Sequence, residues 1–172
     1  MALEGQTRRR GSRDVSRQER RAAARLAAVQ ALYQMDVAKS GINDVLAEFE
    51  SHWIGQEVEG DQYNKAENAF FRNVLEGVLA EQGEIDVLVD RSLQEGWPLR
   101  RVEAVLRAIL RAGAYEMLSR KDVPARVVIT EYTDIGGAFF EGDEVGMING
   151  VLDSLGRRLR PDELMGTARG SR

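Results

Sequence analysis

Apolar residues recur at helical spacing in every long segment of this chain, and this period restricts the fold more than any other feature. The stretch from Arg17 to Val37 is the first example, because an advance of about 100° per residue places a row of apolar side chains on one face. That row consists of Ala22, Leu26, Val29, Tyr33 and Val37. Ser16 and Glu19 have the spacing of a capping box, which predicts that the helix begins there.

The same stretch carries a set of arginines. Helical geometry predicts that Arg17, Arg20 and Arg21 lie on the side opposite the apolar row, with Arg25 at the flank between the two. A helix of this kind can bury one side in a core and present cations on the other.

Six further segments have helical spacing, and short loops separate them. We predict helices at about 43–54, 64–82, 85–93, 98–119, 124–139 and 143–159, with Gly83 breaking the third helix and Pro161 ending the last. Asn64 and Pro98 are the predicted first residues of their helices.

Residues 123–130, with the sequence VPARVVIT, form the one ambiguous segment. Its β-branched residues have strand propensity. Val128, Tyr132, Ile135 and Phe139 nevertheless follow helical spacing, and Pro124 suits the first turn of a helix. We therefore predict a helix here and an all-α fold for the whole chain.

Charge is distributed unevenly along the sequence. Residues 1–25 hold eight arginines and three acidic residues, a net charge of +5, so the remainder must carry −9 to reach the total of −4. This asymmetry predicts a basic arm that binds a polyanion, attached to an acidic body, although a purely solubilising tail is the alternative. We expect residues 1–15 to be disordered, residues 16–160 to form one helical domain, and residues 161–172 to form a mobile tail.

Several classes of function are disfavoured by composition. No apolar run approaches the roughly 18 residues of a membrane span, and a cytoplasmic location is expected. The chain has no cysteine and a single histidine, His52, which is expected to be an ordinary surface or half-packed side chain. A phosphate-binding Walker loop is also missing. The sequence predicts no catalytic residues, no metal site and no cofactor.

Two local sequences go beyond composition. ARLAAVQALYQ in the first helix, and DVPARVVITEYTDI followed by MINGVLD near the end, closely resemble segments of the NusB family of bacterial transcription antitermination factors. FRNVLEGVLAEQGEIDVLVD and RVEAVLRAILRAGAYEML extend the resemblance over about residues 17–160, in the family's order. The resemblance implies about seven helices in two small helical bundles, and a protein that is not an enzyme.

The resemblance also implies a function. Members of the family bind the single-stranded boxA element of ribosomal RNA leader transcripts together with ribosomal protein NusE. They act within the RNA polymerase elongation complex with other Nus factors and promote read-through of terminators. The RNA-binding residues implied for this chain are Arg17, Arg20, Arg21, Arg25, Gln30, Tyr33, Asp143 and Met147.

Some positions depart from the family or have a second interpretation. Gly137 and Gly146 stand where family members usually carry Lys or Arg, and Met147 stands where they carry an aromatic residue. Tyr33 could pack in the core instead of stacking on a base. Asn149-Gly150 favours close helix packing over a binding site.

Two alternative functions and one structural question stay open at this point. The chain could be a protein-interaction adaptor without RNA binding. It could also be a stand-alone RNA-binding domain related to a family of RNA cytosine methyltransferases. The sequence leaves open whether the protein is a monomer or a homodimer.

Overall fold

The computed structural model describes the backbone of residues 4–56, 65–93 and 102–166, which form seven α-helices and no strand. The helices are α1 (Glu4–Ala38), α2 (Ile42–Gln56), α3 (Lys65–Ser92), α4 (Ala104–Ser119), α5 (Ala125–Phe139), α6 (Asp143–Leu159) and α7 (Pro161–Leu164). The predicted all-α class is confirmed. Within these ranges, no helix has the length and apolarity needed to cross a membrane.

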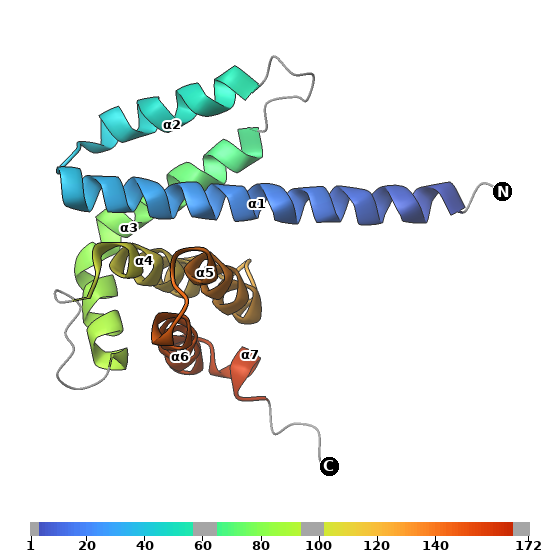
Figure 1. Cartoon of the computed structure of the whole chain (residues 1–172). Coiled ribbons are helices and arrows are strands. Elements are labelled where there is room, and N and C mark those ends of the chain that lie inside the picture. Colours follow the sequence, from blue (N-terminus) through green and yellow to red (C-terminus); the bar gives the residue numbers. More distant parts are fainter. Residues whose placement is uncertain (1–3, 57–64, 94–101, 167–172) are drawn as a thin grey trace, which may run out of the picture.

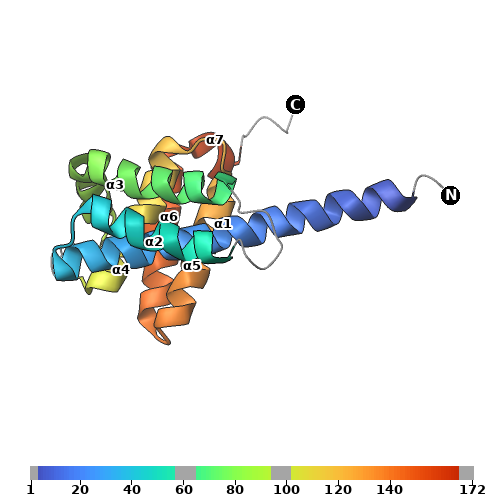
Figure 2. The same ribbon diagram turned by 90° about the horizontal axis from the view of Figure 1, so that it is seen from above.

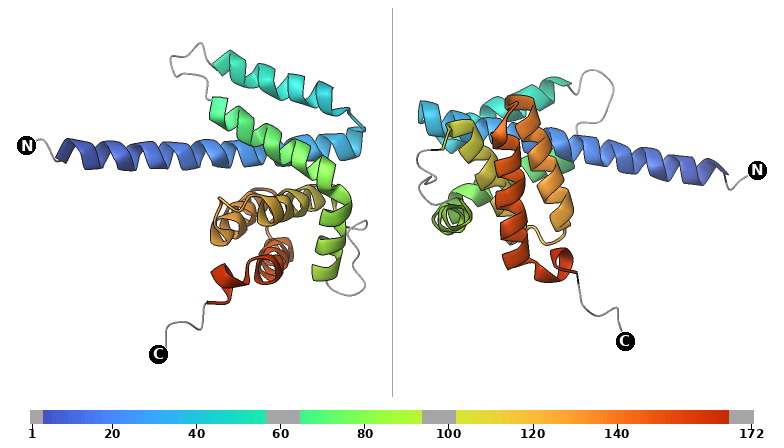
Figure 3. Two further views of the ribbon diagram at one scale, coloured as in Figure 1. Left: turned by 180° about the vertical axis from the view of Figure 1, so that it is seen from behind. Right: turned by 60° about the horizontal axis from the view of Figure 1, so that its bottom comes forward.

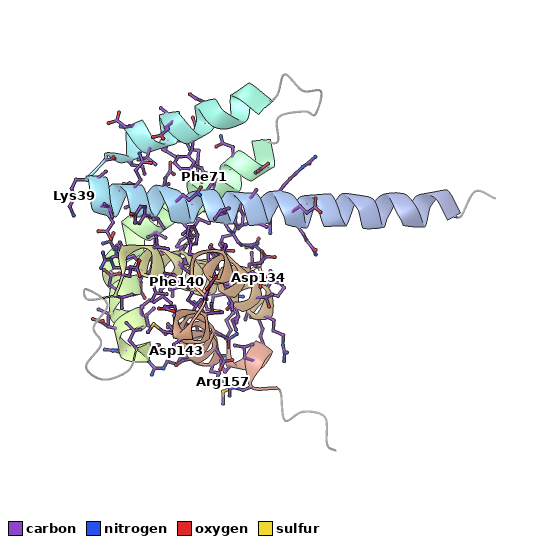
Figure 4. All side chains as sticks on the ribbon, in the orientation of Figure 1. Lys39, Phe71, Asp134, Phe140, Asp143 and Arg157 are labelled. Carbon is purple, nitrogen blue, oxygen red and sulfur yellow. The ribbon has the colours of Figure 1, made fainter. Side chains whose placement is uncertain are left out.

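The long helix α1 organises the fold. In Figure 1, α2 and the first part of α3 lie on one side of α1, and α4, α5 and α6 lie on the other. α3 changes direction along its length, so that it also borders the second group, as Figure 3 shows from behind. The ring of Phe49 in α2 stacks on the ring of Phe71 in α3, with centroids 5.4 Å apart, and thereby holds α2 against α3. Figure 4 labels Phe71. The buried apolar residues of both groups form one continuous core.

The buried face of α1 differs from the predicted apolar row. Ala24, Ala28 and Ala31 are completely buried, whereas Tyr33 is 39% exposed and Val37 is 56% exposed. Small side chains allow α1 to lie close to α3 and α4, which it contacts extensively. The sequence argument was wrong here because it followed the large apolar residues Leu26, Val29, Tyr33 and Val37 and left out Ala24, Ala28 and Ala31.

The start of α1 also differs from the prediction. The helix begins at Glu4, so Ser16 and Glu19 lie inside the helix instead of capping it. Adding turns to a formed helix avoids the cost of nucleation, and Arg, Gln and Glu have good helix propensity. The added turns project beyond the rest of the described chain, as Figures 1 and 2 both show.

Gly83 does not break α3. The helix runs through it to Ser92, where the sequence predicted two separate helices. One glycine costs a helix about 1 kcal/mol relative to alanine. The complete burial of Ile85 and Val89 beyond Gly83 offsets that cost. The predicted helix starts at Asn64 and Pro98 lie outside the described residues, and α4 begins at Ala104.

The last helices follow the sequence closely until Leu159. α5 and α6 have the predicted bounds within one residue, and the ambiguous segment is helical. Residues 161–164 then form the short helix α7, which has Pro161 in its first turn. Just before it, the buried guanidinium of Arg160 donates hydrogen bonds to carbonyl oxygens of Glu116, Met117, Arg120 and Val123, at the end of α4 and in the loop after it. Arg160 thereby ties the start of α7 to the end of α4 and the loop that follows it.

Candidate nucleic-acid interface

A buried ion pair lies where α1 crosses α4. Arg25 is 2% exposed and donates from Nε to Glu116 Oε2 at 2.9 Å and from Nη2 to Glu116 Oε1 at 3.0 Å. Tyr132 of α5 is completely buried and donates its hydroxyl to the same carboxylate. The expectation that Arg25 presents a cation at the surface is therefore wrong, because its charge is already paired inside the protein.

Protonation of this triad is set by its surroundings. Burial alone lowers the pKa of Arg25, but hydrogen bonding and attraction to Glu116 outweigh that effect and raise the pKa above its ordinary value. Burial, reinforced by the Glu116 charge, raises the pKa of Tyr132 well above its ordinary value. Arg25 thus stays charged and Tyr132 stays a hydrogen-bond donor, so all three groups are satisfied.

Two further arginines, Arg21 and Arg120, lie close to the Arg25–Glu116 pair, around the ring of Phe70. The guanidinium carbons of Arg21, Arg25 and Arg120 lie 4.8, 5.0 and 4.9 Å from the centroid of the Phe70 ring. Such distances are those of cation–π contacts. Arg120 is also paired with Asp122 at 2.9 Å. Arg21 forms no ion pair among the described residues, although the charge of Asp122 attracts it.

A groove of about 540 Å³ opens beside this cluster, between α1 and the start of α5. We call it the α1–α5 groove, and it is lined by Arg17, Gln18, Arg21, Arg25, Val123, Pro124, Arg126, Val127, Thr130 and Glu131. Burial lowers the pKa of Arg21, and so does repulsion from Arg17, Arg120 and Arg25. An anion that entered the groove would relieve this repulsion.

Several arginines outside the groove are paired with carboxylates: Arg107 lies 2.6 Å from Asp36, and Arg111 lies 2.8 Å from Asp86. No such ion pair involves Arg17, Arg21 or Arg126 within the described part of the chain. The groove therefore has an excess of positive charge.

One acid lines the groove. Glu131 is half-buried, and among the residues that the structure describes it accepts no hydrogen bond and forms no ion pair. Burial raises the pKa of its carboxyl group, attraction to Arg25 lowers it, and repulsion from Asp134 and Glu116 raises it further.

The other predicted site residues lie outside the groove. Arg20 is exposed. Burial raises the pKa of Glu67 in α3, and the positive charge of Arg20 offsets part of that rise. Gln30 and Tyr33 are also exposed, but helical geometry places them on roughly the opposite side of α1 from Arg17 and Arg21. Arg17 and Arg21 therefore lie on the side of α1 that packs against the core, and Tyr33 lies on the opposite side. The sequence had predicted the reverse.

Asp143 and Met147 belong to a different hollow. This second hollow, of about 520 Å³, lies between α6 and the end of α3 and shares no lining residue with the α1–α5 groove. Gly146 and Gly150 line it as well, and a Cβ atom at either would have no neighbour within 4 Å. The expectation that Asn149-Gly150 marks close helix packing is wrong, because both residues are exposed.

Sequence reasoning missed Arg126 and Val127 as members of the site. They lie more than a hundred residues after Arg17, and only the contact between α1 and α5 brings them together. The sequence feature that could have indicated them is the position of Arg126 next to Pro124, the predicted start of α5. In the described residues, no group of His, Asp or Glu side chains is arranged to hold a metal ion.

Comparison with known proteins places this fold. The model of the NusB family matches residues 22–157. The transcription antitermination protein NusB of Bradyrhizobium sp. (strain BTAi1) is 65% identical over 145 residues, which is 84% of this chain and 86% of that protein. The protein of the same name from Nitrobacter hamburgensis is 62% identical over 144 residues, covering 84% and 90% of the two chains.

Solved structures agree with this result. T. maritima NusB superposes with a TM-score of 0.71 and 29% identity, over 84% of this chain and 96% of the other. A chain from a structure of antitermination factors NusB and NusE in complex with double-stranded RNA has a TM-score of 0.66 at 21% identity, covering 81% and 98%, which shows a shared fold. From the family match and the identity of these relatives, the chain belongs to the NusB family.

Proposed function

We propose that this antitermination factor binds single-stranded RNA of the boxA type, with phosphates of the RNA held by arginines at the α1–α5 groove. The observation that carries the proposal is the excess of unpaired guanidinium groups there, contributed by Arg17, Arg21 and Arg126. Guanidinium groups are well suited to phosphate oxygens because their donors form a planar fork. NusB is non-catalytic, so the proposed function is binding without turnover.

Exposed cations next to the groove extend the proposed site. Arg20 lies within one turn of Arg17 and Arg21 and is exposed. Four more arginines lie in the sequence before residue 16. A strand of RNA that follows α1 away from the body could meet this series in turn.

The name of the relatives supports a role in antitermination, and the solved structure of NusB and NusE in complex with double-stranded RNA supports NusE as a partner. We propose that NusE binds the acidic body and raises the affinity for RNA, because a surface built from two proteins offers more base contacts than arginines alone. Within the RNA polymerase elongation complex, with other Nus factors, the bound RNA would promote read-through of terminators on ribosomal RNA transcripts. Comparing RNA affinity with and without NusE tests this cooperation, and equal affinity would contradict it.

Salt dependence gives a direct test of the groove. For single strands, log affinity changes with log salt by about −0.7 for each phosphate contacted. Arg17→Gln together with Arg21→Gln should therefore flatten the slope by about 1.4 in fluorescence anisotropy with a short boxA RNA. Preference among RNA sequences should change little, since phosphate contacts carry no sequence information.

A matched control removes the same charge elsewhere. Arg157 and Arg158 are exposed in the last turn of α6, and Figure 4 shows Arg157 well separated from α1. Arg157→Gln together with Arg158→Gln should leave the slope nearly unchanged. Equal flattening in both double variants would mean that RNA senses only the total charge, and would contradict a site at the groove.

Gln30, Tyr33, Asp143 and Met147 are proposed as contacts for a longer RNA that passes beyond the groove. The exposed ring of Tyr33 could stack on a base. Tyr33→Ala should then cost about 1 to 3 kcal/mol of RNA affinity without changing the salt slope. Reduced thermal stability with unchanged RNA affinity would show that Tyr33 serves packing instead. If the protein bound RNA neither at the groove nor at these residues, the adaptor function, in which only proteins are bound, would be favoured.

A further inference from the structure

A carboxylate in a phosphate-binding groove is unfavourable unless it has a specific partner. Glu131 lines the groove beside Arg17, Arg21 and Arg126, and it repels any phosphate that those cations attract. Among the described residues its oxygens accept no hydrogen bond. Asp36, Asp86 and Asp122, in contrast, each accept from an arginine. Glu131 therefore lines the groove with a carboxylate that has no hydrogen-bond donor or ion-pair partner among the described residues.

The groove has room and a surface for more than a phosphate. Its volume of about 540 Å³ lies within the range of small-molecule pockets. Val123, Pro124 and Val127 give it an apolar wall against which a planar ring can lie. Guanidinium planes such as that of Arg21 stack on unpaired bases in RNA complexes. These features together suit a nucleobase turned out of a single strand.

We propose that the α1–α5 groove accepts a guanine base, with the Glu131 carboxylate accepting hydrogen bonds from guanine N1–H and N2–H. This inference rests on the proposed function, because the arginines at the rim would hold the adjoining phosphates. Glu131 is thereby a specificity-determining residue for RNA binding.

Guanine is favoured because of the pattern of donors on its Watson–Crick edge. It is the one standard base with two adjacent N–H donors there, which match the two oxygens of a carboxylate. Adenine and cytosine each place an acceptor nitrogen next to their amino group, and uracil places its single N–H between two carbonyl oxygens. A carboxylate would face an acceptor in each of those bases, and a buried polar contact without a donor is costly.

Inosine provides the sharpest test, because it lacks only the 2-amino group of guanosine. The full-length protein is titrated with two short oligouridines that carry one central guanosine or one central inosine. We expect the guanosine strand to bind about tenfold more tightly, a difference of about 1.4 kcal/mol. In Glu131→Gln, the two strands should bind with nearly equal affinity, because the amide no longer offers two acceptors.

The matched control is Asp134→Asn, which removes one negative charge from the same helix. Asp134 is exposed, does not line the groove, and is labelled in Figure 4. This variant should keep the tenfold preference for guanosine. Circular dichroism of both variants establishes that each is folded.

The opposite outcome is equally definite. If Glu131 only repels phosphates, Glu131→Gln binds every strand more tightly and the wild type shows no preference between guanosine and inosine, which overturns the inference. Failure of the proposed function looks different, because RNA binding would then be absent or independent of Arg17 and Arg21. The two failures are therefore distinguishable in one set of titrations.

Discussion

At the scale of single residues, the Arg25–Glu116 pair joins α1 to the centre of the fold. Removing one partner of a buried pair leaves the other charge without compensation, at a cost of about 3 to 5 kcal/mol. We expect Arg25→Met to lower the free energy of unfolding by that amount, because Glu116 is completely buried and would keep only the Tyr132 hydroxyl. Urea denaturation measures the change.

The double variant Arg25→Met with Glu116→Leu is the control for this prediction. Replacing both charged groups with apolar ones of similar size removes the uncompensated charge, and such exchanges are often neutral or stabilising. The double variant should therefore be more stable than Arg25→Met alone. If the two were equally unstable, packing of the Arg25 stem would account for the loss instead of its charge.

Residue-scale reasoning from the sequence predicted exposed side chains for Arg17 and Arg20 but assigned them to the wrong side of α1, and it did not predict the burial of Arg25. Spacing along a helix gives the direction of each side chain but not the neighbour that it meets. Glu116 is 91 residues away from Arg25, and nothing local identifies the two as partners. For the same reason Arg126 and the position of Glu131 in the groove became apparent only when α1 and α5 were placed side by side.

At the scale of elements, helix content followed from periodicity, and helix boundaries were less predictable. The bounds of α5 and α6 were predicted because Pro124 marks the start of α5, Pro161 follows the end of α6, and apolar residues keep helical spacing between these limits. α3 and α1 were not, since Gly83 and the Ser16–Glu19 spacing are only weak local preferences. Tertiary burial and continuation of an existing helix outweighed both.

The two central glycines of α3 make a prediction about packing. A Cβ on Gly77 would overlap the ring of Tyr115, which is buried and bonded to Asn73 at 3.1 Å, whereas a Cβ on Gly83 would have no neighbour within 4 Å. Gly83→Ala should therefore stabilise the protein by up to about 1 kcal/mol through helix propensity. Gly77→Ala should destabilise it by about 1 to 3 kcal/mol through overpacking.

Thermal or urea denaturation of the two variants side by side checks this prediction. Each variant is the control for the other, because the substitution and the helix are the same. Stabilisation by both would mean that Tyr115 moves aside easily, and destabilisation by both would mean that α3 needs the flexibility of glycine at Gly83.

At the scale of the whole molecule, α1 divides into a part that packs and a part that projects. Arg17 is the first residue of α1 that lines the α1–α5 groove. The turns of α1 that precede Arg17 extend beyond the body (Figure 2). Four of the eight arginines in residues 1–25 precede residue 16. The unequal distribution of charge along the sequence thus becomes a spatial separation, with a cationic projection on an acidic body.

Deletion of residues 1–15 should therefore separate binding from stability. The shortened helix would begin at Ser16, where Glu19 provides the spacing of a capping box, so its new end has an available cap. We expect a nearly unchanged melting temperature together with a salt slope flattened by up to about 3, the value for four lost phosphate contacts. The preference for guanosine over inosine should survive, since Glu131 and the groove stay intact. A large fall in melting temperature would show that the projecting turns pack on the body, and an unchanged salt slope would show that RNA does not follow α1 beyond the groove.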